Sequence, residues 1–206
     1  MIRSSLTAIA AFALVATAGA AAAQSPANPS PAAVQAGAYG VEPAHTRVLF
    51  SVSHMGFSTW YGEFTGASGS LTLDPKNARV DAVSVSVPTA SISTSNATLN
   101  EELKGDKWFD AAKFDTISFR STKVVPTGAK TADVVGELTL HGVTRPVTLK
   151  ATFNAAGVNP LTKGYTVGFE VSGDIKRSDF GVSTYVPLIG DDVHLIISAA
   201  FEKKAS

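Results

Sequence analysis

The chain has 206 residues with 17 basic and 17 acidic side chains, so its net charge at neutral pH is zero. The length is compatible with one β domain, and the even charge balance excludes a nucleic-acid-binding surface or a basic stripe for anionic membranes. The absence of cysteine excludes disulfides, a lipoprotein anchor and thiol chemistry, so stability must come from the core.

Residues 1–23 have the pattern of a secretory signal peptide. Arg3 gives a positive start, residues 6–20 form an apolar run, and three alanines end at Ala23. This order is typical of a cleaved export signal, so we expect cleavage near Ala23. An uncleaved membrane anchor is the alternative, but the alanine-rich run is only weakly hydrophobic.

Residues 24–38 contain three prolines and no charged side chain. This composition gives no periodic apolar face, so the sequence predicts a disordered linker here. The folded domain is expected over residues 39–204.

The first part of this domain alternates apolar and polar residues with the period of a β-strand. Val48, Phe50 and Val52 share one face, and Pro88 ends the last strand of this part because proline cannot donate to the ladder. Strands are expected at residues 46–54, 59–65, 68–73 and 79–87.

The alternation stops at residues 95–108, where a short amphipathic helix is predicted. Leu99 and Leu103 lie four residues apart, and the residues around them are charged. Ser95 or Asn96 is expected to cap the helix, and Gly105 to end it.

Further strands are expected at residues 116–123 and 134–140, followed by three long ones between residues 147 and 201. Each of these three has one apolar face and one mostly polar face. The sequence therefore predicts an all-β fold, an antiparallel eight-stranded β-barrel with a short helical insert. Such a barrel can hold one small ligand, so its apolar interior is either a packed core or a pocket.

The sequence shows no motif for catalysis, a metal or a nucleotide. The four histidines are not at metal-ligand spacing, and serine-hydrolase and dinucleotide motifs are absent. His45 and His54 bracket one strand and are expected roughly 30 Å apart. His141 is expected to make a structural hydrogen bond in a turn, and His194 to be exposed. No catalytic residue, metal or cofactor is predicted, so the protein is not expected to be an enzyme.

Aromatic side chains gather in two stretches, before the helical insert and within and after it. One interpretation is that they fill an ordinary core. The other is that they line the mouth of an apolar cavity, with the insert as a lid.

Four ordered motifs resemble those of the YceI-like family. They are EPAHTRVLF at residues 42–50, SHMGFS at 53–58, LHGVTRPV at 140–147 and KRSDFG at 176–181, and LKGDKWFD at 103–110 falls in the matching place. Glu42 stands where the family usually has Asp, which is a conservative change.

The resemblance implies a lipocalin-like, polyisoprenoid-binding barrel, exported to the periplasm and not catalytic. We therefore expect a carrier for a polyprenyl quinone, its precursor or a similar long amphiphilic lipid, with no nucleic acid among its partners. Family members are also described as homodimers. The residues expected to contact the lipid are Phe50, Val52, Phe57, Trp60, Leu103, Trp108, Phe109, Phe119, Leu138, Leu140, Val167, Phe169, Val171 and Phe180.

Four polar residues are candidates for the rim of the site, namely His45, His54, Arg177 and Asp179. Arg177 and Asp179 belong to the Arg-Ser-Asp-Phe motif and would hold either a lipid head group or each other. Two alternatives stay open. One is an enzyme acting on a lipid-like substrate with a rim histidine, and the other is a partner-binding module for a membrane redox protein.

Overall fold

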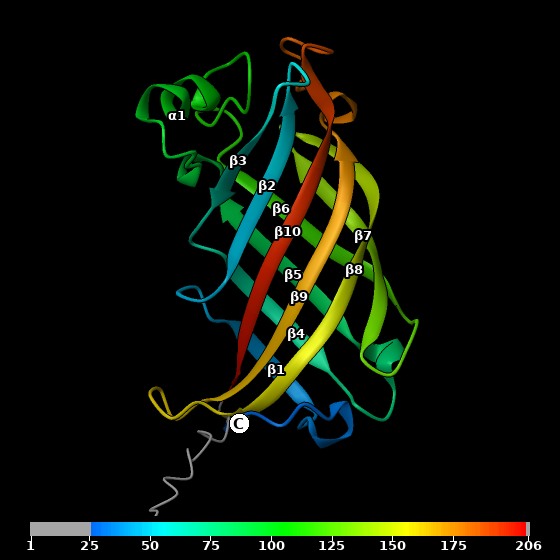
Figure 1. Cartoon of the computed structure of the whole chain (residues 1–206). Helices are drawn as coiled ribbons and strands as arrows, with labels where there is room; N and C mark the ends of the chain where they lie inside the picture. Colours follow the sequence, from blue (N-terminus) through cyan, green and yellow to red (C-terminus); the bar gives the residue numbers. More distant parts are fainter. Residues whose placement is uncertain (1–25, 205–206) are drawn as a thin grey trace, which may run out of the picture.

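One continuous antiparallel sheet runs through the computed structural model, which describes residues 26–204 (Figure 1). Alternating apolar residues on each strand turn one face of this sheet inward. Its strands are β1 (Gly37–Val41), β2 (Arg47–His54), β3 (Ser58–Phe64), β4 (Ser68–Leu73), β5 (Ala82–Pro88), β6 (Thr116–Pro126), β7 (Thr131–Leu140), β8 (Val143–Val158), β9 (Tyr165–Lys176) and β10 (Ile189–Lys203).

The sheet closes into a barrel because β1 pairs with β10. The ring is β1-β4-β5-β6-β7-β8-β9-β10, eight strands in all, and β2 and β3 extend the sheet from β10. β1 pairs with the last part of β10, at Phe201–Lys203, whereas β2 pairs with its earlier part, between Ile189 and Ser198. The predicted eight-stranded barrel is confirmed, with two further strands in one half of its wall.

The helical insert lies beside β3 (Figure 1). Glu63 of β3 and Ser93 exchange two backbone hydrogen bonds, of 2.8 and 2.9 Å. The helix that follows, α1 (Ala97–Lys104), begins after Asn96, whose side chain accepts a hydrogen bond from the Leu99 backbone N–H at 3.1 Å. Gly105 ends it, so both predicted helix boundaries are confirmed.

The segment before β1 packs under the opposite end of the barrel. Asn28 bridges to Ala156 of β8, and a short 3₁₀ helix at Pro31–Ala33 leads to Val34, which is buried. Val34 and Tyr39 belong to a core cluster with Phe153, Val167 and Phe201. The predicted disordered linker over residues 24–38 is therefore wrong from residue 26 onward, because Val34 anchors a segment that otherwise looks featureless.

The predicted signal peptide at residues 1–23 lies outside the described residues. Among residues 26–204, the helices are all too short or too polar to cross a lipid bilayer. β1 was not predicted from the sequence, because its Gly-Ala-Tyr-Gly-Val stretch has too few apolar residues to show alternation.

Candidate functional site

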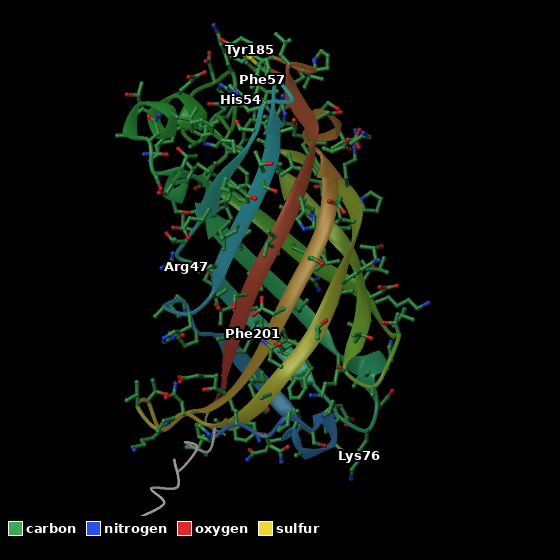
Figure 2. The ribbon with its side chains drawn as sticks, in the orientation of Figure 1. Arg47, His54, Phe57, Lys76, Tyr185 and Phe201 are labelled. Carbon is green, nitrogen blue, oxygen red and sulfur yellow. The ribbon has the colours of Figure 1, made fainter. Side chains whose placement is uncertain are left out.

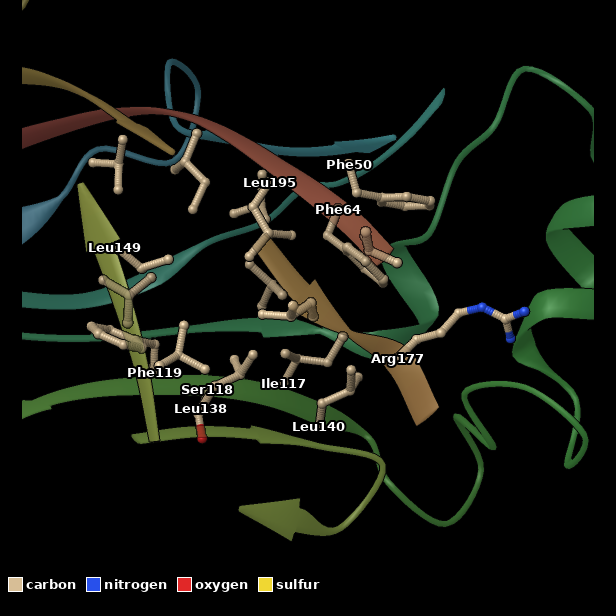
Figure 3. Close-up of a pocket in the computed structure, with 18 of the residues that line it drawn as sticks. Phe50, Phe64, Ile117, Ser118, Phe119, Leu138, Leu140, Leu149, Arg177 and Leu195 are labelled. Atoms are coloured by element: carbon tan, nitrogen blue, oxygen red, sulfur yellow. The ribbon is translucent and has the colours of Figure 1, made fainter. Parts of the chain in front are cut away.

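A cavity of about 800 Å³ occupies the interior of the barrel (Figure 3). Every second residue of β10, from Val193 to Phe201, lies on its wall. These residues span about 25 Å of strand at 3.3 Å per residue. The cavity extends from the end beside α1, here called the mouth, toward the core cluster around Tyr39 and Phe153.

The cavity wall is apolar and incompletely packed. Val85, Val134, Val171 and Leu195 face the interior, yet each is only partly buried. Side chains in a close-packed core lose nearly all their accessible surface, so this residual exposure shows unfilled space. Of the two interpretations of the barrel interior, the structure supports the pocket.

The structure places most of the expected lipid-contacting residues on this wall. Those that line the cavity are Phe50, Val52, Trp60, Leu103, Trp108, Phe109, Phe119, Leu138, Leu140, Phe169 and Val171. Contact with a ligand stays a prediction for each of them. Period-2 alternation identified the strand residues, and amphipathic spacing identified Leu103.

Three expected residues lie elsewhere. Phe57 is 90% exposed in the turn between β2 and β3, where the chain reverses and alternation no longer fixes direction. Val167 is fully buried in the core cluster that closes the far end of the barrel. Phe180 is buried against Leu138 and Leu140, outside the cavity surface. These three assignments are corrected.

Arg177 lies at the mouth, beside the insert (Figure 3). Its guanidinium donates to the carbonyl oxygens of Val182, Thr184, Ile189 and Gly190, each at 2.9 Å. It also lies 5.4 Å from the centre of the Trp108 ring. Arg177 is 5% exposed, and burial lowers its pKa while nearby Asp191 opposes that shift. The residue thus fixes the loop that forms one side of the mouth.

Arg177 and Asp179 do not hold each other. In the described part of the chain their side chains form no ion pair, and Asp179 is exposed with its backbone carbonyl accepting from Arg145. The nearby acid is Asp191, whose carboxylate accepts hydrogen bonds of 2.8 and 2.9 Å from Ser178. Burial raises the pKa of Asp191, but these bonds and the charges of Lys176 and Arg177 lower it further, so the net shift is downward.

The two rim histidines occupy different environments. His54 ends β2, lines the cavity and packs against Trp60, with ring centres 5.8 Å apart. The Trp60 Nε1 is buried and has no hydrogen-bond partner within residues 26–204. His45 instead precedes β2, is exposed, and bonds to Glu42 at 2.5 Å. His54 therefore belongs to the mouth, and His45 does not.

Asp81 is an acidic residue of the cavity wall that was not among the residues predicted from the sequence. It directly precedes β5 and accepts a hydrogen bond of 2.7 Å from the Asp74 backbone N–H. Burial, with a smaller contribution from the Asp74 carboxylate, raises the pKa of Asp81 to about 6. A charged residue at a strand start looks exposed in the sequence, and only the barrel's curvature turns it inward.

The remaining histidines have the structural roles expected of them. His141 lies in a tight turn, and its Nδ1 donates to the Phe180 carbonyl at 3.2 Å. His194 is exposed on β10 and pairs with Asp174. Residues 26–204 contain no cluster of His, Cys, Asp and Glu that could hold a metal ion.

The family model for the YceI-like domain matches residues 39–201. The chain belongs to the YceI-like family. A UPF0312 protein of Yersinia pestis is 39% identical over 157 residues, which cover 76% of this chain and 81% of that protein. A related UPF0312 protein of Yersinia enterocolitica is 38% identical over the same length.

Solved structures share the barrel of this YceI-like chain. BcnA of Burkholderia cenocepacia has 26% sequence identity and a TM-score of 0.71, covering 78% of this chain and 98% of that one. The YCEI protein of Campylobacter jejuni has 28% identity and a TM-score of 0.67, covering 74% and 90%. A polyisoprenoid binding domain from Saccharophagus degradans has 16% identity, a TM-score of 0.62 and coverage of 81% and 98%, and this likeness concerns the fold.

Proposed function

We propose that this YceI-like protein binds a polyisoprenoid lipid, such as a polyprenyl quinone or its precursor, with the isoprenoid tail inside the barrel. The observation that carries the proposal is the 800 Å³ cavity with its partly exposed apolar wall. Ligand sites in proteins commonly measure about 300–1,000 Å³, so the volume suits one lipid molecule.

The wall favours a long tail over a compact ligand. Its residues come from strands on all sides of the barrel and are overwhelmingly aliphatic or aromatic. Each methylene moved from water to such a wall contributes about 0.8 kcal/mol, which offsets the lost freedom of a flexible chain. The fold of the Saccharophagus polyisoprenoid binding domain agrees with this proposal.

Polar groups at the mouth suit a head group that accepts hydrogen bonds. The guanidinium of Arg177 has five N–H donors, of which its carbonyl contacts use four. The Trp60 Nε1–H also lacks a partner among the described residues, but it is buried and is not counted here as a donor to the head group. One unused guanidinium donor beside an apolar cavity suits an oxygen of a quinone or a phosphorylated isoprenoid.

The protein acts as a binding protein in this proposal, and it works in the periplasm after removal of residues 1–23. The enzyme alternative needs a rim histidine with a carboxylate partner. The histidine that has one, His45, bonds to Glu42 on the exposed surface, away from the cavity wall. The expected homodimer and membrane redox partner stay predictions.

The test is native mass spectrometry of the mature protein purified from its own cells, followed by organic extraction. A co-purifying isoprenoid lipid near one per chain is the expected result. A binding series should follow, with polyprenyl quinones that share one head group and differ in tail length. Affinity should rise at least about ten-fold per added isoprene unit until the cavity is full.

A quinone head group without a tail is the control, and it should bind weakly. Affinity that does not depend on tail length would contradict the proposal, because it would place the binding energy in the head group. A protein that neither co-purifies with lipid nor takes it up would contradict it as well.

A further inference from the structure

The mouth of the cavity ends in an exposed apolar tip. The tip consists of Met55 and Phe57 from the β2–β3 turn and Tyr185 and Leu188 from the loop before β10. Their exposed fractions are 49%, 90%, 61% and 61%. Figure 2 shows Phe57 and Tyr185 together at one end of the barrel, beside His54. The Met55 backbone N–H donates to the Leu188 carbonyl at 2.8 Å, which joins the two loops.

The two segments that carry the tip contain no charged side chain. Residues 55–62 and 181–190 have no Asp, Glu, Lys or Arg, although 17% of the whole chain is charged. Inserting even one ionised side chain into hydrocarbon costs several kcal/mol. The lack of charge is therefore what a segment that enters a bilayer requires.

Two residues of the tip have uncommon backbone conformations. Met55 and Tyr185 have φ angles of 54° and 60°. The other non-glycine residues with positive φ among residues 26–204 are Ser95, Asp110, His141 and Lys163, all polar. A positive φ is uncommon for bulky side chains and tends to occur at functional sites. In the turn, Met55 and Gly56 both have positive φ and the Phe57 N–H bonds to the His54 carbonyl, which is a tight hairpin turn that holds Phe57 exposed.

We infer that this tip docks the protein on a lipid bilayer, where it inserts Phe57 and its neighbours at the mouth of the cavity. The inference rests on the proposed function, because a lipid that resides in a membrane must pass from the bilayer into the barrel. Met55, Tyr185 and Leu188 also line the cavity, so the tip is continuous with the lipid site. Tyr185, which packs edge-on against Trp108, suits the bilayer interface, where tyrosine and tryptophan are enriched.

A second copy of the chain fits the tip less well. A stable protein interface buries about 800 Å² on each partner. Large aromatic side chains bury about 150–250 Å² each, so a convex tip with two of them falls short of that area. A bilayer needs no complementary shape and accepts a small inserted wedge.

The first experiment places a single cysteine at the tip, since the chain has none. Phe57→Cys, labelled with a polarity-sensitive fluorophore, is mixed with vesicles of phosphatidylcholine. Leu161→Cys is the matched control, because Leu161 is 87% exposed in the β8–β9 hairpin at the other end of the barrel. We expect a blue shift at position 57 and none at 161. The shift should persist at high salt, because the interaction is apolar rather than ionic.

The second experiment measures vesicle partitioning of unlabelled protein. Phe57→Asp should lower the partition coefficient at least about ten-fold, Phe57→Leu should largely keep it, and Leu161→Asp should leave it unchanged. Uptake of a polyprenyl quinone from detergent micelles should be the same for Phe57→Asp as for the wild type, because Phe57 does not line the cavity.

The outcomes separate the two proposals. Normal quinone uptake without vesicle binding rejects the docking tip and leaves the lipid site. Vesicle binding without quinone uptake rejects the lipid site and keeps the tip. Equal losses of vesicle binding for Phe57→Asp and Leu161→Asp reject the docking tip. A dimer of the wild type in sedimentation that Phe57→Asp abolishes rejects it as well.

Discussion

Arg177 shows how one side chain can shape the entrance to a cavity. A planar guanidinium offers donors in a fixed fork, and here four backbone carbonyls accept them, two in the loop before β10 and two at the start of β10. Lysine has a single ammonium group on a flexible stem and cannot reach four carbonyls in this arrangement. With lysine at position 177, some of these carbonyls would stay buried without a hydrogen-bond donor, which costs free energy.

Arg177→Lys should therefore destabilise the mouth loop. We expect the free energy of unfolding to fall by about 2–4 kcal/mol and hydrogen exchange to accelerate at residues 182–190. Arg145→Lys is the control, because the Arg145 side chain is exposed and donates one hydrogen bond, to the Asp179 carbonyl. Unchanged exchange at residues 182–190 in Arg177→Lys would show that the loop is held by other contacts.

Asp81 should make stability depend on pH. Its pKa is raised from 3.8 to about 6 in the folded protein, so folding favours the protonated carboxyl. The stability that this group contributes is present below about pH 4 and is lost as pH rises to about 6. An asparagine at position 81 does not ionise, so Asp81→Asn should not lose stability as pH rises. At pH 7 we expect the variant to be more stable than wild type by about 1 kcal/mol, allowing for solvent screening of a half-buried group.

Denaturant titration of Asp81→Asn and wild type at pH 4 and pH 7 measures this effect. At pH 4 the two proteins should have nearly equal stability. A difference of the same size at both pH values would mean that the substituted amide acts through packing rather than through charge.

Individual residues of the wall were predictable from the sequence wherever a strand is regular. Val52, Phe169 and Val171 follow from alternation alone, because the period of a strand fixes which side chains share a face. Phe57 was not predictable in this way, since a turn ends the alternation. Asp81 was missed for a different reason, because the burial of a charged residue depends on which other strands curve over it.

The insert that contains α1 is the element whose role the structure defines most clearly. Leu103 is buried in a cluster with Phe64, Ile92 and Trp108, so the helix packs over the mouth end of the barrel. The Trp108 Nε1–H donates to the Glu102 carboxylate at 3.1 Å, which ties the loop after the helix to the helix itself. The insert therefore lies beside β3 as a packed unit at the mouth end of the barrel.

Leu103→Ala should loosen this cover. A buried leucine truncated to alanine typically costs about 2–5 kcal/mol, and we expect the lower end here because the helix packs at an edge. A bound polyprenyl quinone should dissociate faster, and amide exchange should accelerate at Ala97–Lys104. Glu101→Ala, on the exposed side of the same helix, should change neither rate. Equal dissociation rates for wild type and Leu103→Ala would argue that the insert does not limit ligand exit.

Elements differ in how clearly the sequence predicts them. The helix could be predicted with both ends, because Asn96 and Gly105 are strong boundary signals around a four-residue apolar spacing. The segment before β1 and β1 itself could not, because their packing depends on Val34 in the segment and Tyr39 in β1, among small and polar residues. Two isolated apolar side chains show no periodicity in the sequence. They are buried only because other strands build the far end of the barrel around them.

At the scale of the whole molecule, an unfilled interior should tolerate added volume. Val171→Trp places a large side chain in the middle of the cavity wall, where Val171 is only partly buried. In a close-packed core such a change costs about 1–3 kcal/mol, but here the free energy of unfolding should change by less than about 1 kcal/mol. Binding of a long-tailed polyprenyl quinone should fall at least about ten-fold.

Calorimetry and a binding titration of the same variant measure both effects. Ile196→Trp is the control, because Ile196 is exposed on the outer face of β10. Strong destabilisation by Val171→Trp would indicate that the interior closes up in solution. The barrel class itself was predictable from strand count and alternation, whereas the choice between core and cavity needed the three-dimensional closure of the sheet.

The pairing of β1 with β10 also governs when the protein can form. Tyr39 lies opposite Lys203, so the contacts that close the ring join residues about as far apart in sequence as the domain permits. A growing chain cannot make them until its last strand has appeared, and long-range closure of this kind slows folding. Until then the ring cannot close around its inward-facing apolar residues. The cavity is thus a property of the finished chain, and ligand binding is expected to appear in a single late step of folding rather than gradually.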